Sequence, residues 1–145
     1  MDALTVLIVD DNSAHSEGLT ELMKIKGIIA LHAATGSDAV RVASTHPVDA
    51  VLLDVHLPDM TGYNVCRQLR SDPAMEKVAI IFHTGTAWFP EEGHGGDAFL
   101  TYPIIFSDLL AVIEGCVCKR KGKAVSGVGN PMQNAHYAAN RSVFP

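Results

Sequence analysis

The chain has 145 residues, of which 48% are hydrophobic and 19% are charged, a balance typical of one folded domain with its own core. It contains no run of about 20 apolar residues that could span a bilayer and no signal peptide, so we expect a cytoplasmic protein. Residues 1–118 carry 16 acidic and 6 basic side chains, whereas 119–145 carry 5 basic ones and no acid. This acidic excess excludes general nucleic-acid binding by residues 1–118, because such binding requires neutralised phosphates.

Five short apolar runs follow one another along the chain, each bounded by polar or turn-forming residues. Runs of this kind are typical of buried strands in a parallel sheet. We expect these strands at residues 4–9, 28–31, 48–53, 78–82 and 99–102.

Helical patterns lie between most of these runs. Asn12 or Ser13 can cap a first helix, a second is expected from Ser37, a third has its apolar face within residues 65–69, and Ser107 can cap the last. Because strands and helices alternate, right-handed crossovers should produce a parallel sheet that is covered on both faces.

Two segments break this rhythm. Residues 86–97 contain one proline, three glycines and no helical stripe, so we expect the helix at this place to be shortened or missing. Trp88 and Phe89 in this segment are interpreted as folding onto the sheet, with an exposed partner patch as the alternative. Residues 119–145 begin with a KRKGK run and lack periodicity, which predicts a folded domain over 1–118 and a flexible basic tail over 119–145.

Three aspartates stand at the downstream ends of predicted strands: Asp10 and Asp11 after the first, and Asp54 after the third. Ligands bind beyond the carboxyl ends of strands in open α/β sheets, so these acids should converge. Crowded carboxylates are relieved by protonation or by a hard cation with oxygen ligands, above all Mg²⁺. The weaker alternative is helix capping by Asp10 or Asp11 and a solvated loop for Asp54. His15 and His56 would also suit a transition metal, an interpretation that we rank low.

Four segments together resemble the receiver domain of two-component response regulators, over roughly residues 4–118. The resemblance implies a doubly wound, flavodoxin-like α/β fold with a five-stranded parallel sheet in the order 2-1-3-4-5. The matching segments are VLIVDDN at 6–12, LLDVHLPDMTG at 52–62, VCRQLRSDP at 65–73 and IIFHTG at 80–85.

The resemblance also implies a role for each site residue. Asp54 would be the phosphoacceptor, Asp11 a direct Mg²⁺ ligand and Asp10 a ligand through water. The backbone carbonyl of His56 would be a further Mg²⁺ ligand, and Thr84 the switch hydroxyl. The cation is needed because a carboxylate must approach a phosphorus atom surrounded by negative oxygens. Without the resemblance, Thr84 would be interpreted as a strand-end residue with a satisfied hydroxyl.

The chain departs from the family pattern at three positions. Tyr102 precedes Pro103 where the family has lysine, and a neutral hydrogen bond of about 0.5–1.5 kcal/mol replaces a charged one of roughly 1.5–3 kcal/mol. Gly85 replaces a small residue with a Cβ, which loosens the backbone after the switch residue. Phe99 takes the aromatic switch position and has no hydroxyl. We therefore expect phosphorylation with a blunted conformational response.

The first functional hypothesis is a single-domain response regulator that is not an enzyme beyond its own phosphoryl transfer and autodephosphorylation. Asp54 would receive a phosphoryl group with Mg²⁺ from a histidine kinase or phosphotransfer protein, and the chain would signal to an unknown downstream protein. We expect no membrane partner and no nucleic acid bound by the receiver body, and a homodimer is left open. The alternative is a phosphorylation-independent pseudo-receiver that acts as an interaction module. A phosphatase of the haloacid dehalogenase type is discounted, since it needs an acid at the position of His56. The KRKGK run is interpreted as solvated, with docking on an acidic surface as a bolder alternative.

Overall fold

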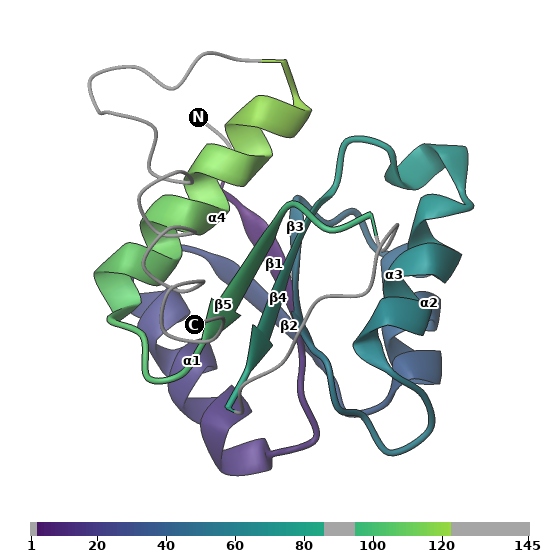
Figure 1. The fold of residues 1–145 in the computed structure, drawn as a ribbon. Coiled ribbons are helices and arrows are strands. Elements are labelled where there is room, and N and C mark those ends of the chain that lie inside the picture. Colours follow the sequence, from purple (N-terminus) through teal and green to yellow (C-terminus); the bar gives the residue numbers. More distant parts are fainter. Residues whose placement is uncertain (1–2, 86–94, 123–145) are drawn as a thin grey trace, which may run out of the picture.

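Short apolar stretches form the strands, and amphipathic segments between them form the helices that cover the sheet (Figure 1). The computed structural model describes residues 3–85 and 95–122. Each predicted strand overlaps an observed one, with ends that differ by at most two residues. The elements in chain order are β1 (Thr5–Val9), α1 (Ser13–Ile25), β2 (Ile29–Ala33), α2 (Gly36–Thr45), β3 (Ala50–Asp54), α3 (Gly62–Arg70), a short 3-10 helix (Pro73–Met75), β4 (Ala79–Thr84), β5 (Ala98–Thr101) and α4 (Phe106–Arg120).

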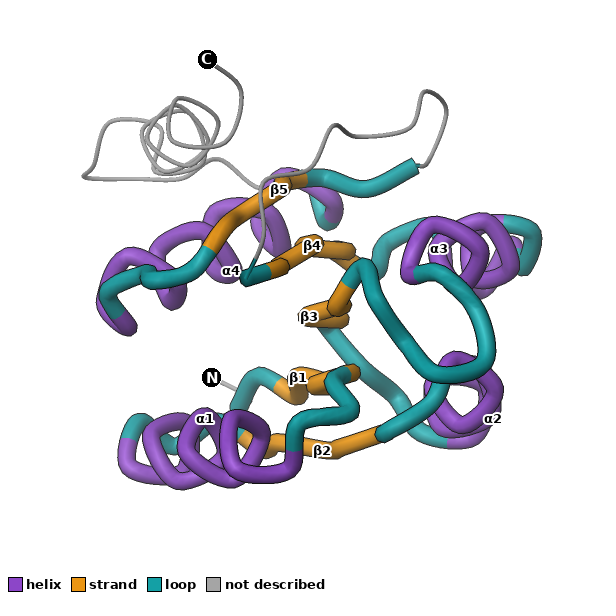
Figure 2. The backbone as a smooth tube through the Cα atoms, turned by 60° about the horizontal axis from the view of Figure 1, so that its bottom comes forward, coloured by secondary structure: helices purple, strands orange, loops and turns teal. Residues whose placement is uncertain are grey.

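The five strands form one parallel sheet in the order β2-β1-β3-β4-β5, which confirms the predicted topology. Figure 2 shows α1 and α4 on one face of this sheet and α2 and α3 on the other. Alternating strand residues therefore enter two separate cores: Leu52 packs on the α1 and α4 side, and Leu53 on the α2 and α3 side. Both side chains are fully buried, as expected of strands covered on both faces.

Side-chain caps fix the start of most helices. Asn12, Thr35 and Thr61 each accept a hydrogen bond from a backbone N–H in the first turn of α1, α2 and α3. The predicted cap at Asn12 is confirmed, whereas the cap predicted at Ser107 is wrong. The last helix begins at Phe106, and no side chain caps it. Phe106 packs against the core, so burial of this ring places the helix start before the serine.

The described end of the chain is anchored to the body. The α4 helix continues to Arg120, and the Arg120 Nε donates to Asp97 Oδ1 at 2.8 Å. Lys121 Nζ lies 2.6 Å from Asp49 Oδ1. Each acid directly precedes a strand. The first residues of the basic run therefore contact acids at the end of the sheet where the strands begin, and the three aspartates lie at the other end. The domain boundary at 118, and the flexibility of the tail, stay predictions.

Three predictions lie wholly or largely outside the described residues. These are the shortened or missing helix within 86–97, where only residues 95–97 are described, the packing of Trp88 and Phe89, and the flexibility of the tail, of which only residues 119–122 are described. Within residues 3–85 and 95–122, no helix is both long enough and apolar enough to cross a bilayer.

The turn after β3 depends on a glycine. A Cβ on Gly62 would lie 2.2 Å from the backbone oxygen of Asp54, so Gly62→Ala must displace the backbone that carries this aspartate. We expect Gly62→Ala to lower the free energy of unfolding by about 1–3 kcal/mol in urea denaturation. The control is Gly18→Ala in α1, where a Cβ would meet no atom within 4 Å, and we expect a gain of roughly 0.5–1 kcal/mol. Equal stability of the two variants would contradict the steric argument.

Candidate metal centre

Three carboxylates meet where two neighbouring strands end. Asp10 directly follows β1, Asp54 is the last residue of β3, and Val9 pairs with Leu53 in the parallel ladder between these strands. One carboxylate oxygen each from Asp10, Asp11 and Asp54 lies within 4.8 Å of the others. The sequence predicted this convergence. The capping alternative for Asp10 and Asp11 is wrong, because Asn12 caps α1.

The three acids differ in their contact with solvent. Asp10 is 3% exposed, Asp54 is half-buried and Asp11 is exposed. The backbone N–H of Asn12 donates to Asp10 Oδ1 at 2.9 Å, and that of His56 donates to Asp54 Oδ1 at 3.1 Å. One deep and one open carboxylate provide oxygen ligands for a hard cation and keep a route to solvent.

Ionisation of the Asp54 carboxyl group is unfavourable in the folded state. Burial first, and then the negative charges of Asp10 and Asp11, raise the pKa of this carboxyl from 3.8 to about 6, although the His56 N–H bond acts in the opposite direction. A divalent cation would relieve this repulsion, so the donor set and its electrostatics fit Mg²⁺.

Stability should report this raised pKa in metal-free solution. A carboxyl with a folded-state pKa of about 6 favours the folded state only while protonated, so its unfavourable effect appears as the pH rises from 3.8 to above 6. We therefore expect Asp54→Asn to match the wild type near pH 4 and to exceed its free energy of unfolding by about 1–2 kcal/mol above pH 7, after allowance for solvent screening of this half-buried group. Urea denaturation in EDTA measures the difference.

Asp59, in the loop that follows β3, provides a control because its pKa is shifted in the opposite direction. Its carboxylate accepts hydrogen bonds from the backbone N–H groups of Gly36 and Ser37, at 2.7 and 2.9 Å, which lower its pKa. Its stabilising effect is complete above pH 3.8 and disappears as the pH falls through the lowered pKa. Asp59→Asn should therefore lose stability at neutral pH. The same pH trend in both variants would contradict the assigned causes.

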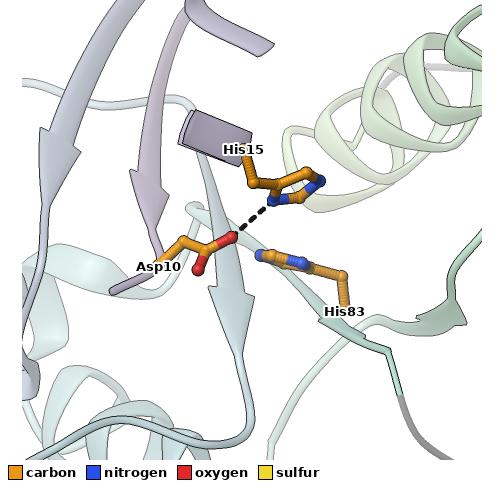
Figure 3. A group of neighbouring side chains, drawn as sticks. All are labelled: Asp10, His15 and His83. Carbon is orange, nitrogen blue, oxygen red and sulfur yellow. Dashed lines mark hydrogen bonds and ion pairs between the residues drawn. The ribbon is translucent and has the colours of Figure 1, made fainter. Parts of the chain in front are cut away.

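A cluster of rings lies beside the acids, and the sequence did not predict its composition. His15 Nδ1 lies 2.5 Å from Asp10 Oδ2, and the Tyr102 hydroxyl is hydrogen-bonded to Nδ1 of His83 and lies 3.5 Å from His15 Nδ1 (Figure 3 shows Asp10 and the two histidines). His83 pairs with Asp54 in the ladder between β3 and β4. In the described residues, His15 thus lies in a possible metal-binding group with His83, and not with His56 as in the low-ranked alternative from the sequence.

The alternation of strand side chains explains why these residues meet. Successive side chains of a strand point to opposite faces, so residues two positions apart point to the same face. The residue two positions before each polar residue lies in the core under α1 and α4, so the polar side chains also point to that face. These preceding residues are Ile8 before Asp10, Leu52 before Asp54, Ile81 before His83 and Leu100 before Tyr102. The position of His83 could therefore have been predicted from the sequence, because it is a polar residue two positions after Ile81 and near the end of a strand.

Tyr102 and Thr84 occupy the positions that the sequence singled out beyond the acids. Burial, followed by the charges of Asp10 and Asp54, raises the pKa of the Tyr102 phenol, which keeps this side chain neutral. A cis peptide bond joins Tyr102 to Pro103. Thr84 is the buried last residue of β4. The roles of these residues, and of the His56 carbonyl, stay predictions.

Comparison with known proteins identifies the class. Residues 6–114 match the sequence model of the response regulator receiver domain, and the chain belongs to this family of two-component signalling modules. The cell cycle response regulator CtrA of Brucella ovis is 30% identical over 127 residues, which cover 85% of this chain and 54% of that protein. The chain thus spans about half the length of the curated relatives it matches.

Solved structures agree with this assignment. A CheY-like receiver domain from Methylobacillus flagellatus has a TM-score of 0.71 and 29% identity, covering 79% of this chain and 99% of the other. The receiver domain of the sensor histidine kinase PA1611 from Pseudomonas aeruginosa has a TM-score of 0.72 and 25% identity, covering 80% and 98%. The PA1611 receiver structure has a magnesium ion coordinated in its active-site cleft. Receiver domains bind Mg²⁺ at such a cleft, and this chain has an acidic cluster.

Proposed function

We propose that the chain accepts a phosphoryl group on Asp54 from a phosphohistidine of a kinase or phosphotransfer protein, and then signals by binding another protein. The observation that supports this most strongly is the approach of three carboxylates from two adjacent strands to within 4.8 Å. Asp11, Asp54 and the His56 carbonyl would hold Mg²⁺ directly, and Asp10 would hold it through water.

The chemistry follows from positions and charges. A carboxylate oxygen of Asp54 forms the new P–O bond while the P–N bond of the donor breaks and its electron pair returns to the imidazole. Bound Mg²⁺ supplies the positive charge that lets the carboxylate and the phosphoryl oxygens approach. The protein provides the alignment: the His56 N–H holds one oxygen of Asp54, and half-burial leaves the site open to the donor.

The proposal predicts a specific covalent product. Full-length chain incubated with phosphoramidate and Mg²⁺ should gain one phosphoryl group, seen as a mobility shift on a phosphate-affinity gel and as a mass increase. Asp54→Asn, or EDTA in place of Mg²⁺, should abolish the product, because the nucleophile or the neutralising charge is gone. Asp59→Asn is the matched control and should be phosphorylated as the wild type is. Modification that persists in Asp54→Asn would disprove the assignment.

A second function, a pseudo-receiver whose partner binding ignores phosphorylation, is favoured by two observations. The Tyr102 hydroxyl is bonded to His83 and is neutral, so it offers no ammonium to a phosphoryl group. Gly85 gives the backbone after Thr84 more conformational freedom, which would weaken transmission of a change at Thr84, and packing does not require this glycine, since a Cβ there would meet no atom within 4 Å.

Restoring the missing cation separates the two functions. We expect Tyr102→Lys to raise the affinity for beryllofluoride with Mg²⁺ about five- to thirtyfold, because a charged hydrogen bond exceeds a neutral one by roughly 1–2 kcal/mol. Tyr102→Phe, which also breaks the bond to His83, is the control and should give no increase. Isothermal titration calorimetry measures both. Unchanged affinity in Tyr102→Lys would show that the site does not hold a phosphoryl analogue in the proposed manner.

A further inference from the structure

We propose that Asp10, His15 and His83 form a second metal site, selective for a borderline transition ion such as Zn²⁺ and distinct from the oxygen-only Mg²⁺ site. The three residues come from three elements: the end of β1, the first turn of α1 and the end of β4. One ligand atom of each lies within 4.8 Å of the other two. In Figure 3 both imidazole rings face the Asp10 carboxylate.

The unpaired nitrogen of His83 is the observation that points to a ligand. His83 is 1% exposed, and its Nδ1 bonds to the Tyr102 hydroxyl. The buried Nε2 makes no hydrogen bond of good geometry with the described residues, although backbone groups of Val9 and Leu52 lie near enough to interact with the ring. An unsatisfied buried polar group destabilises the folded state, so such groups are rare without a function. The far end of the ring is turned toward the carboxylate of Asp10, where an ion would satisfy it.

The donor types select the metal. Two imidazole nitrogens and one carboxylate oxygen suit Zn²⁺, Co²⁺ or Ni²⁺, whereas Mg²⁺ prefers oxygen ligands alone. Three protein ligands leave a fourth tetrahedral position for water. Tyr102 completes the arrangement, because its oxygen can accept the Nδ1–H of His83 and so leave Nε2 deprotonated for the metal.

The existing contacts are compatible with this ion. His15 Nδ1 and Asp10 Oδ2 form a hydrogen bond of 2.5 Å, and a metal would replace the proton of this bond and separate the two atoms around itself. The other carboxylate oxygen, Asp10 Oδ1, accepts the N–H of Asn12. Asp10 is also the acid assigned to Mg²⁺ only through water, so the Oδ2 that faces the histidines is available for a direct bond.

Full-length, EDTA-treated chain titrated with Co²⁺ provides the test. We expect one bound Co²⁺ with visible ligand-field absorption, displaced by Zn²⁺. His15→Gln and His83→Gln should each weaken Co²⁺ binding by at least about tenfold. Loss of a group that only orients a metal ligand already costs about ten- to a hundredfold in affinity, so loss of a direct ligand should cost no less. His46→Gln, which removes an exposed imidazole at the end of α2, is the matched control and should bind as the wild type does.

Two further variants keep the test decisive. Asp54→Asn should retain the Co²⁺ spectrum although it cannot be phosphorylated, so the metal site and the proposed phosphorylation can fail independently. If His83→Gln does not fold, as judged by thermal unfolding, the result rests on His15→Gln, whose side chain is 30% exposed and tolerates change. Binding of equal strength in His15→Gln and His46→Gln, or no Co²⁺ spectrum in the wild type, would overturn the proposal.

Discussion

The constraint on which this structure depends is the crowding of negative charge at the carboxyl ends of two adjacent parallel strands. The pairing of Val9 with Leu53 places the residues after them side by side, and neither strand can slip by one residue without moving its side chains to the other core. The register therefore keeps the backbone positions of these acids close together. Fully buried neighbours such as Leu7, Leu52 and Leu53 hold the strands in place. Burial first, and then the charges of Asp10 and Asp11, raise the pKa of Asp54 at this position.

Much of this arrangement was predictable because it depends on periodicity. Buried apolar runs separated by amphipathic helical segments determine a parallel sheet. The strands of such a sheet all end on the same side, which brings Asp10 and Asp54 together. His83 was not predicted, since a histidine at the end of an apolar run has no visible partner until strand order and phase place it beside Asp54 and Asp10. The helix start at Phe106 was missed for a related reason: a tertiary contact outweighed the local preference of Ser107 for a cap.

Tyr102 shows how one substitution changes the character of the site. The neutral phenol lies against two imidazoles, with ring centroids 4.4 Å from His15 and 5.2 Å from His83. An ammonium at this position would add a fixed positive charge next to Asp10 and Asp54. The phenol instead adds a hydrogen bond to His83, and burial lowers the pKa of that imidazole, which keeps it neutral. The negative charge of the acids is thus left for cations from solution.

Paired charges lie at the opposite end of the sheet, where the strands begin. The Asp97 side chain, 16% exposed, binds Arg70 of α3 at 3.0 Å and Arg120 of α4 at 2.8 Å, and it also accepts the backbone N–H of Ile80 at 2.9 Å. One acid therefore joins both helical layers to the sheet where the strands begin. Partly buried, multiply bonded pairs resist disruption far better than exposed ones, since removing a partner leaves a desolvated charge. Because the charges at the beginnings of the strands are paired, the fold can leave the acids at the ends of the strands without a lysine or arginine partner among the described residues. Such an acidic cluster attracts a cation, and only a bound cation lets a phosphoryl group approach it.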